Sequence, residues 1–399
     1  MKEISITEPN FQLSSGGLVR LILQRAHRTG AGEFSYQTQM LFAIAILWLP
    51  LVVLTLIADT FVGNGVAKPF INDLVPQVRF LIALPLLLLA DMAIDPAVAG
   101  AIRNLQASGV VPASEQSRFK AALTKLAQHR DSVWPDVVML VLAFSITWLF
   151  QPGYGASAIE TADTSWLRSI SDGNVTLSTA GWWYVLVSGP LFQFILFRWM
   201  WRFLIWADFL RRVSRVSLAL HATHPDLSGG IGVLGLVQQT FVVVFVAFGA
   251  IMSSTIAHNI MFEGDTFKAS RPEIIVFVIA CVVVIYAPLL FFSGQMYRER
   301  RIGLNQYGAL GHRLSEAFYE KWIKGAGSDV GTALKEAIDP SAMADYAATF
   351  DIVRSMRAIP VSLRSIVTVA AILTIPFMPL SLTEFSITDL LQRMADALV

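Results

Sequence analysis

The sequence predicts an all-α protein, a polytopic transmembrane helical bundle of about seven spans with amphipathic cytoplasmic helices. Of its 399 residues, 55% are hydrophobic and 15% are charged, whereas soluble proteins average about 45–50% and about 25%. The hydrophobic residues come in long blocks separated by charged stretches, which is the pattern of a chain that crosses a bilayer repeatedly. One membrane domain therefore explains the length better than two or three soluble domains.

The chain opens with residues 1–39, which we expect to form a cytoplasmic amphipathic leader. Over residues 16–28, leucine and isoleucine alternate with arginine, and this predicts a basic helix lying on the membrane surface. The first long apolar stretch begins only near Met40. This late start argues against a cleavable signal peptide.

The membrane domain, residues 40–294, contains six segments long enough to cross a hydrocarbon layer about 30 Å thick. These predicted spans are residues 40–62, 76–94, 135–151, 182–205, 233–257 and 274–294. A seventh span, residues 361–382, lies within the last segment, 361–399, which ends in an outer tail. Because the seventh span contains Pro376 and Pro379, a broken or re-entrant helix is an equally open interpretation.

The loops alternate in charge. Lys and Arg total 21 in the presumed inner segments and 5 in the outer ones. Because positively charged loops stay in the cytoplasm, we expect a multi-pass protein with a cytoplasmic N-terminus and an outer C-terminus. Trp182, Trp183 and Tyr184 open the fourth span and fit the aromatic belt at the bilayer surface.

Two inner segments are predicted to be helical. Five apolar residues of 114–131 fall on one helical face, with Ser114 as the expected N-cap; they are Phe119, Ala122, Leu123, Leu126 and Ala127. Within the cytoplasmic segment 295–360, one helix runs from Leu304 to Phe318, and a second follows Asp339 to about Met356. These helices form either a collar that completes the bundle or a contact for a second copy or a cytoplasmic partner.

Polar and ionisable residues inside spans are candidates for a substrate or ion path. The candidates are Arg79, Asp91, Gln193, Arg198 and Gln238. Arg79 lies just inside the outer boundary and either binds an anion in a cavity or snorkels to headgroups beside Asp73.

The other four candidates lie deeper in the bundle or nearer its inner side. Pro190 predicts a bend close to Gln193, and we expect a cavity there that Gln238 also faces. Asp91 is about 18 Å along its helix from Arg79. Arg198 and its neighbour Arg202 are typical of the cytoplasmic end of a span.

The string before the fifth span contains His221, His224, Asp226, Gly229 and Gly230. Imidazole and carboxylate groups suit zinc or manganese, so a metal site is one interpretation, although the metal is unknown. Backbone amides at a glycine-rich helix start favour an anion site. A tight turn that permits close helix packing is the third interpretation.

Two short sequence runs are similar to runs in a known protein family. They are the run from Val78 to Leu86 and the run from His224 to Gly230. Both are similar to a family of uncharacterised bacterial multi-spanning inner-membrane proteins. The resemblance implies a bacterial inner-membrane setting, and no activity comes with it.

Several function classes are disfavoured. A net charge of +1 without a long basic run disfavours nucleic acid as a partner. The chain has neither a GxxxxGK[ST] loop nor a GxSxG elbow, so we assign no catalytic residue and expect no cofactor. A channel or transporter-like protein for ions or small solutes is the first hypothesis. A non-transporting sensor or scaffold and a metal-dependent membrane enzyme at the His221 string are the alternatives, and the lipid bilayer is the common partner.

Overall fold

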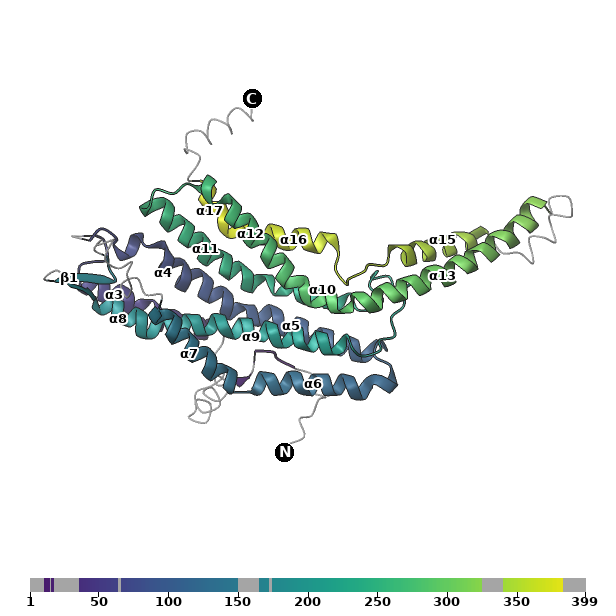
Figure 1. Ribbon diagram of the computed structural model, residues 1–399, viewed down its shortest axis with the longest axis horizontal. Coiled ribbons are helices and arrows are strands. Elements are labelled where there is room, and N and C mark those ends of the chain that lie inside the picture. Colours follow the sequence, from purple (N-terminus) through teal and green to yellow (C-terminus); the bar gives the residue numbers. More distant parts are fainter. Residues whose placement is uncertain are drawn as a thin grey trace, which may run out of the picture.

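The computed structural model describes residues 11–14, 16–17, 36–63, 66–149, 165–171, 174–324 and 340–382. Helices dominate this part of the chain, with one antiparallel pair of strands, β1 (Arg168–Ser171) and β2 (Asn174–Leu177). The α-helices are α2 (Tyr36–Leu47), α3 (Leu49–Ile57), α4 (Leu74–Val78), α5 (Leu84–Ala107), α6 (Gln116–Asp131), α7 (Trp134–Leu149), α8 (Thr179–Trp183), α9 (Gly189–Val213), α10 (Val233–Thr240), α11 (Val242–Phe262), α12 (Phe267–Tyr286), α13 (Ser293–Phe318), α15 (Pro340–Ser355), α16 (Leu363–Thr374) and α17 (Met378–Ser381). The predicted all-α class is confirmed (Figure 1).

Short 3₁₀ and π turns join many of these helices. The 3₁₀ turns are η1 (Phe70–Asn72), η3 (Ala113–Glu115), η6 (Ala287–Phe292) and η8 (Ile375–Phe377), and the π turns are η2 (Arg79–Ala83), η5 (Tyr184–Ser188) and η7 (Tyr319–Lys324). Consecutive elements therefore form long rods, namely Leu74–Ala107, Thr179–Val213 and Phe267–Phe318.

The number of membrane spans agrees with the prediction of about seven. In the described residues, six helices are long and apolar enough to cross a bilayer, or up to seven if α6 and α7, which meet at a 43° bend, count as one span. The third predicted span is the doubtful one, because α7 by itself has only 16 residues.

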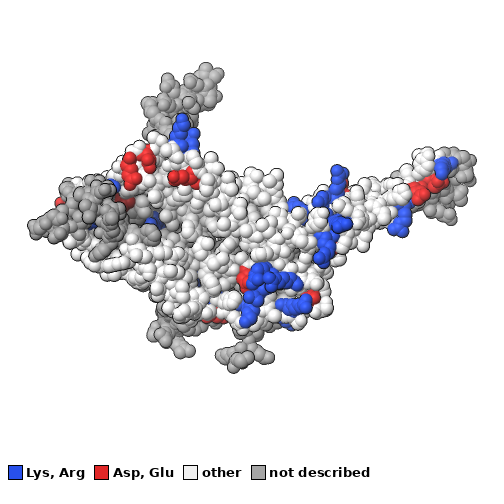
Figure 2. Space-filling view, viewed as in Figure 1, with Lys and Arg blue, Asp and Glu red and all other residues white. Residues whose placement is uncertain are grey.

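The sides of the bundle are apolar. Phe42 on α2 is 67% exposed and Val276 on α12 is 66% exposed, and Figure 2 shows a broad band of surface that carries no charged side chain. Large apolar side chains in a continuous band are unfavourable in water. Lipid is therefore the solvent that this surface fits, and the chain is a multi-pass membrane protein.

The charged side chains gather towards the two ends of the bundle (Figure 2). We call the end that carries β1 and β2 the β end, and the end that carries α6 the α6 end (Figure 1). Between them, α5, α9 and α11 enclose a core of large aromatic side chains. Phe80, Phe192, Trp206 and Phe241 are each no more than 1% exposed in this core.

Helix α6 packs along the α6 end of α9. The five apolar residues predicted to share one face are all buried, and the ring of Phe119 meets that of Phe209 edge-on at 6.1 Å. This prediction is confirmed. The expected N-cap at Ser114 is wrong, because Ser114 lies inside the 3₁₀ turn η3 and α6 begins after Glu115.

The segment after the sixth span differs from the prediction of a separate helix. Pro288 lies in the 3₁₀ turn η6, and α12 continues through this turn into α13 as one rod. Helix α15 folds back along α13. The Tyr346 hydroxyl donates to the Tyr307 carbonyl at 2.6 Å, and Arg300 Nη2 donates to the Arg354 carbonyl at 3.0 Å, so the two helices are antiparallel.

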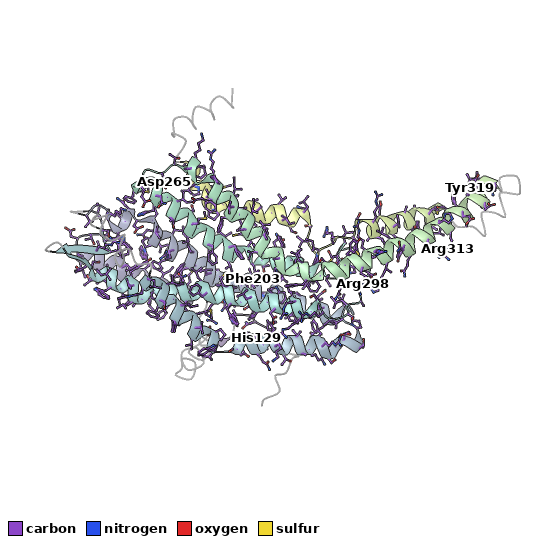
Figure 3. The ribbon with its side chains drawn as sticks, in the orientation of Figure 1. His129, Phe203, Asp265, Arg298, Arg313 and Tyr319 are labelled. Carbon is purple, nitrogen blue, oxygen red and sulfur yellow. The ribbon has the colours of Figure 1, made fainter. Side chains whose placement is uncertain are left out.

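The α13–α15 hairpin projects from the α6 end and is not a collar around the bundle (Figure 1). Met296, Gly303 and Val353 at its base are buried, whereas Figure 3 places Arg313 and Tyr319 far out along it. The collar interpretation is therefore wrong. The predicted cap Asp339, together with residues 325–338, lies outside the described residues, and so does most of the predicted leader helix.

Candidate functional site

A cavity of about 850 Å³ lies at the β end, among the spans and the loops that join them. Its wall is built by residues of the second, third and fourth predicted spans, of the end of α11 just past the fifth predicted span, and of the segments around η1 and β1. The residues that line the cavity include Lys68, Asp73, Arg79, Thr147, Trp166, Arg168, Tyr184, Gly189, Gln193, His258 and Glu263. Two of the predicted path residues, Arg79 and Gln193, meet here.

Arg79 is a cation of the cavity wall that has no carboxylate partner within the described ranges. Its Nη1 donates to the Tyr184 hydroxyl, and its guanidinium carbon lies 5.6 Å from the centre of the Phe192 ring. Its Nε is buried and has no hydrogen-bond partner among the described residues. A buried donor of this kind costs about 1–3 kcal/mol when it stays unpaired, and no described carboxylate neutralises the charge of the guanidinium.

The pairing of Arg79 with Asp73, which the snorkelling interpretation suggested, is not found. The Asp73 carboxylate accepts from Trp166 Nε1 at 3.0 Å and from the Val75 amide at 3.1 Å. His258 Nδ1 lies 3.6 Å from the same carboxylate. Asp73 therefore fixes the cavity wall and leaves the guanidinium of Arg79 available.

Both helices that carry the Arg79–Tyr184 contact widen into a π turn at that level. Arg79 is the first residue of η2 and Tyr184 the first of η5, and a proline follows each by six residues, at Pro85 and Pro190. Proline has no amide hydrogen and clashes with the carbonyl four residues earlier. A π turn relieves this clash, and such turns occur frequently at functional sites.

Small and polar residues close to Pro190 line the cavity. A methyl group at Gly189 would meet Thr147 Cγ2 at 2.8 Å, so glycine permits the close approach of α9 and α7. Gln193, one turn further along α9, lines the cavity, and its side chain has no hydrogen-bond partner in the described part of the chain. Its amide is thus free for a ligand or water.

The loops add further charge at the cavity. Lys68 lies 5.4 Å from the Phe262 ring centre, and burial lowers the pKa of Arg168 below its ordinary value. Within the described ranges, neither cation makes a salt bridge, and Glu263 is the second carboxylate of the wall after Asp73. The described wall thus has three Lys or Arg side chains, Lys68, Arg79 and Arg168, and two carboxylates, Asp73 and Glu263.

A buried charge network occupies the α6 end and includes two other predicted path residues. Arg202 Nη1 lies 2.8 Å from Asp91 Oδ1, and Arg198 Nε lies 3.6 Å from Asp136 Oδ1. Asp91 and Arg198 thus have partners and do not line the cavity. Arg202 is only 9% exposed, so it is buried in this network, and its expected place near the cytoplasmic end of a span stays a prediction.

The N-terminal segment closes over this network. The Asp95 carboxylate accepts from the Leu13 amide at 2.8 Å, from the Ser14 amide at 3.1 Å and from the Ser14 hydroxyl. Arg202 Nη2 donates to the Ser14 carbonyl at 3.0 Å. Residues 13 and 14 therefore cover buried charges of α5 and α9.

The fifth predicted path residue, Gln238, has a packing role. Its side chain is fully buried, accepts from Trp206 Nε1 at 2.9 Å and donates to the Ile285 carbonyl at 2.6 Å. Every polar group of the amide thus has a partner. Gln238 links α10 to α9 and α12, and the expectation that it faces the cavity is wrong.

The His221 string folds around its own aspartate. Asp226 accepts from the amides of Ser228, Gly230 and Gly232 at 2.8, 3.2 and 2.9 Å. Burial raises the pKa of Asp226, but these donors together with His224 outweigh it and leave the pKa below its ordinary value. The carboxylate occupies the place that an anion would take at these amides.

The tight-turn interpretation fits this loop best. Gly229 and Gly230 adopt positive φ angles of 69° and 98°, and the backbone amide of Arg357 donates to the Leu227 carbonyl at 2.8 Å. In the described part of the chain, no group of three His, Cys, Asp or Glu residues can hold a metal ion. His221, His224 and Asp226 therefore do not form the proposed metal centre.

Sequence reasoning missed Tyr184, Trp166 and His258 as cavity residues. Tyr184 was placed in the aromatic belt, yet its hydroxyl accepts from Arg79 inside the bundle. The equal spacing of Arg79 and Tyr184 from their prolines was the signal in the sequence that pointed to it. No comparable pattern marks His258 or Trp166, because loops and a distant helix bring them to the cavity.

Comparison with known proteins finds no relative, since no family model, no curated protein and no solved structure matches the chain. The resemblance of the two short strings therefore carries no argument about function.

Proposed function

We propose that this membrane protein binds a small anionic solute at Arg79 in the cavity of the β end and carries it across the bilayer. The observation that carries the proposal is the guanidinium of Arg79 in the wall of a cavity of about 850 Å³, where no carboxylate of the described residues pairs with it. A guanidinium offers several donors in a fixed plane and matches carboxylate, phosphate or similar oxyanions.

The neighbours of Arg79 support an anion over a cation. The carboxylate of Asp73 is engaged by Trp166 and a backbone amide, whereas Lys68 has no ion-pair partner among the described residues. The unpaired Gln193 side chain supplies a neutral donor deeper in the wall. An anion entering from the β end would therefore meet donors that no described residue satisfies.

Transport, rather than binding alone, is supported by the order of layers along α5 and α9. Beyond Arg79, the buried rings of Phe80 and Phe192 meet edge-on at 5.9 Å, and the Asp91–Arg202 pair follows. A cavity at one end with a packed barrier at the other is one state of an alternating-access cycle. The π turns η2 and η5 lie where the two helices would bend during the change.

The proposal includes the membrane and the orientation of the protein in it. The excess of Lys and Arg in the segments at the α6 end supports a cytoplasmic α6 end and a cavity that faces outward in a bacterial inner membrane. Reporter fusions within residues 95–134 test this orientation. A reporter that is active only outside the membrane would reverse it.

Uptake into proteoliposomes tests the anion proposal. We expect concentrative or exchange uptake of at least one member of a panel of chloride, nitrate, acetate, phosphate and benzoate. Arg79→Gln should lower that uptake about 10–100-fold, since a hydrogen bond to a charged group contributes about 1.5–3 kcal/mol. Lys268→Gln is the matched control, because Lys268 is an exposed cation near the same end that does not line the cavity.

Two results would refute the proposal. One is that no anion of the panel is taken up by protein that retains its fold. The other is that Arg79→Gln and Lys268→Gln have equal effects on the uptake that is found.

A non-transporting sensor or scaffold is the second candidate, and the α13–α15 hairpin favours it. The hairpin projects from the bundle (Figure 1) and leaves Leu310 at 40% and Tyr319 at 51% exposure, which suits contact with another protein. Replacing residues 304–352 by a flexible linker should leave insertion of the spans intact. Loss of a stoichiometric partner with normal anion uptake would separate this role from transport.

A further inference from the structure

A second polar site lies at the α6 end, in a groove between α6 and the C-terminal end of α9. The groove has a volume of about 640 Å³, and four of its eight lining residues are basic while none is acidic. The basic residues are Arg118, Lys125, Arg212 and Arg215. The others are two alanines, a threonine and a valine. The groove is therefore lined by basic side chains and by small ones.

Two of the four cations have no partner inside the protein. The side chains of Lys125 and Arg215 are exposed and make no hydrogen bond or ion pair with the described residues. Arg118 contacts Glu115 at 3.4 Å, and Arg212 uses its Nε for Asp208 at 2.6 Å. The terminal amino groups of Arg212 remain available, so each wall presents donors to the groove.

The groove is held rigidly. The apolar face of α6 is buried against α9, and Phe119 and Phe209 lie face to edge in that contact. Arg118 and Lys125 are seven residues apart, so they share one side of α6 beside this buried face, where Ala122 also reaches the groove. Because the helix is already packed on the bundle, these cations keep their distance from Arg212 and Arg215 without a ligand.

The groove lies close to the start of α13. Gln295 Nε2 donates to the carbonyls of Ser214 and Val216 at 2.6 and 2.9 Å, so Gln295 marks the level of Arg215. Phe291, which is 45% exposed, precedes Gln295 by one helical turn, about 6 Å. The headgroup layer extends about 5–7 Å beyond the hydrocarbon, so a hydrocarbon edge at Phe291 would put Arg215 at headgroup depth.

We propose that this groove binds the phosphate headgroup of an anionic phospholipid from the adjoining leaflet. Basic pockets beside transmembrane helices bind such headgroups because several cations converge on one phosphate at low salt screening. Figure 2 shows Lys and Arg gathered over this end of the bundle. The bound lipid bridges α6 to α9 and fixes the surface helix at the membrane boundary.

Lipid binding to the full-length protein tests the proposal. Delipidated protein is placed in nanodiscs of phosphatidylcholine that contain a trace of fluorescent phosphatidylglycerol, and energy transfer from the protein's tryptophans reports its enrichment. The double variant Lys125→Ala with Arg215→Ala should bind the probe about 30-fold more weakly, from about fivefold for each basic side chain at a membrane surface. Both side chains are exposed and unpaired, so the fold should be unchanged.

Lys120→Ala with Arg301→Ala is the matched control, because both are exposed cations near the α6 end that do not line the groove. Equal loss in the two double variants would overturn the proposal, since it would mean general attraction to the surface. Displacement of the probe by millimolar inorganic phosphate would also overturn it, by showing a site for a free anion. Anion uptake through the cavity at the β end is measured separately, so failure of either proposal leaves the other standing.

Discussion

Replacing Asp226 by alanine should destabilise the protein through the loop between α9 and α10. The carboxylate accepts three backbone amides, and a hydrogen bond to a charged acceptor contributes about 1.5–3 kcal/mol. The Asp226 side chain is 25% exposed, so water replaces part of this in the variant. We therefore expect the free energy of unfolding to fall by about 3 kcal/mol, well below the sum of three separate bonds.

Asparagine at the same position removes the charge of Asp226 but keeps the size and shape of its side chain. One carboxylate oxygen accepts from Ser228 and Gly230, and the other accepts from Gly232 at 2.9 Å. Asp226→Asn keeps the first acceptor, but its amino group faces the Gly232 amide, where two donors oppose each other. About half of the alanine effect, roughly 1.5 kcal/mol, should remain.

The pH dependence follows from the lowered pKa of Asp226. The hydrogen bonds to Gly232, Ser228 and Gly230 outweigh burial and hold the folded-state pKa below the ordinary value. A carboxylate with a lowered pKa contributes stability that is complete above the unfolded pKa, about 4, and is lost as pH falls through the folded pKa. The difference between wild type and Asp226→Asn should thus stay constant from pH 7 to 5 and shrink below about 4.

The assay is reversible unfolding of the detergent-solubilised protein with increasing dodecyl sulfate, followed by tryptophan fluorescence. Hydrogen exchange over residues 226–232 gives an independent local measure, and exchange there should accelerate in Asp226→Ala. An alanine variant as stable as wild type, or a difference that is the same at pH 3.5 and pH 7, would refute this account of the loop.

Two further predictions concern contacts between helices. Arg202→Met should lower the free energy of unfolding by about 3–5 kcal/mol, because it leaves the carboxylate of Asp91 buried without its cation; adding Asp91→Leu should restore most of the loss in the same dodecyl sulfate titration. Gly311→Val should separate α15 from α13, since a β-carbon there would collide with the Tyr346 ring and hydroxyl. Limited proteolysis would then cut the hairpin faster, with the spans unaffected, and unchanged cleavage would contradict the antiparallel packing.

Several features of this protein were readable from the sequence because they depend on local patterns. The burial of apolar surface in lipid depends on the length and composition of each segment, so about seven spans were predicted and six to seven were found. The helical period placed Phe119 and Leu126 on the buried face of α6 in the same way. Arg79 and Gln193 were selected because polar groups are rare in a span.

The hydrogen-bond and ion-pair partners of polar side chains could not be predicted from the sequence, because they come from segments far apart in the chain. Arg202 was expected near the cytoplasmic end of its span, but the sequence did not indicate its contact with Asp91, 111 residues away. Gln238 was expected to face the cavity, but packing gave its amide two buried partners in Trp206 and Ile285. The hydrophobicity of a side chain does not specify which neighbouring group forms its hydrogen bonds or ion pairs.

The sequence by itself determined that the chain is a bundle of membrane-spanning helices, because the transfer of each apolar segment into lipid depends on that segment alone. Only the tertiary structure decided that two π turns place Arg79 against Tyr184, and that Asp226 fills its own anion site. Those contacts depend on how the helices pack, and packing joins residues according to their positions in space rather than their order in the chain.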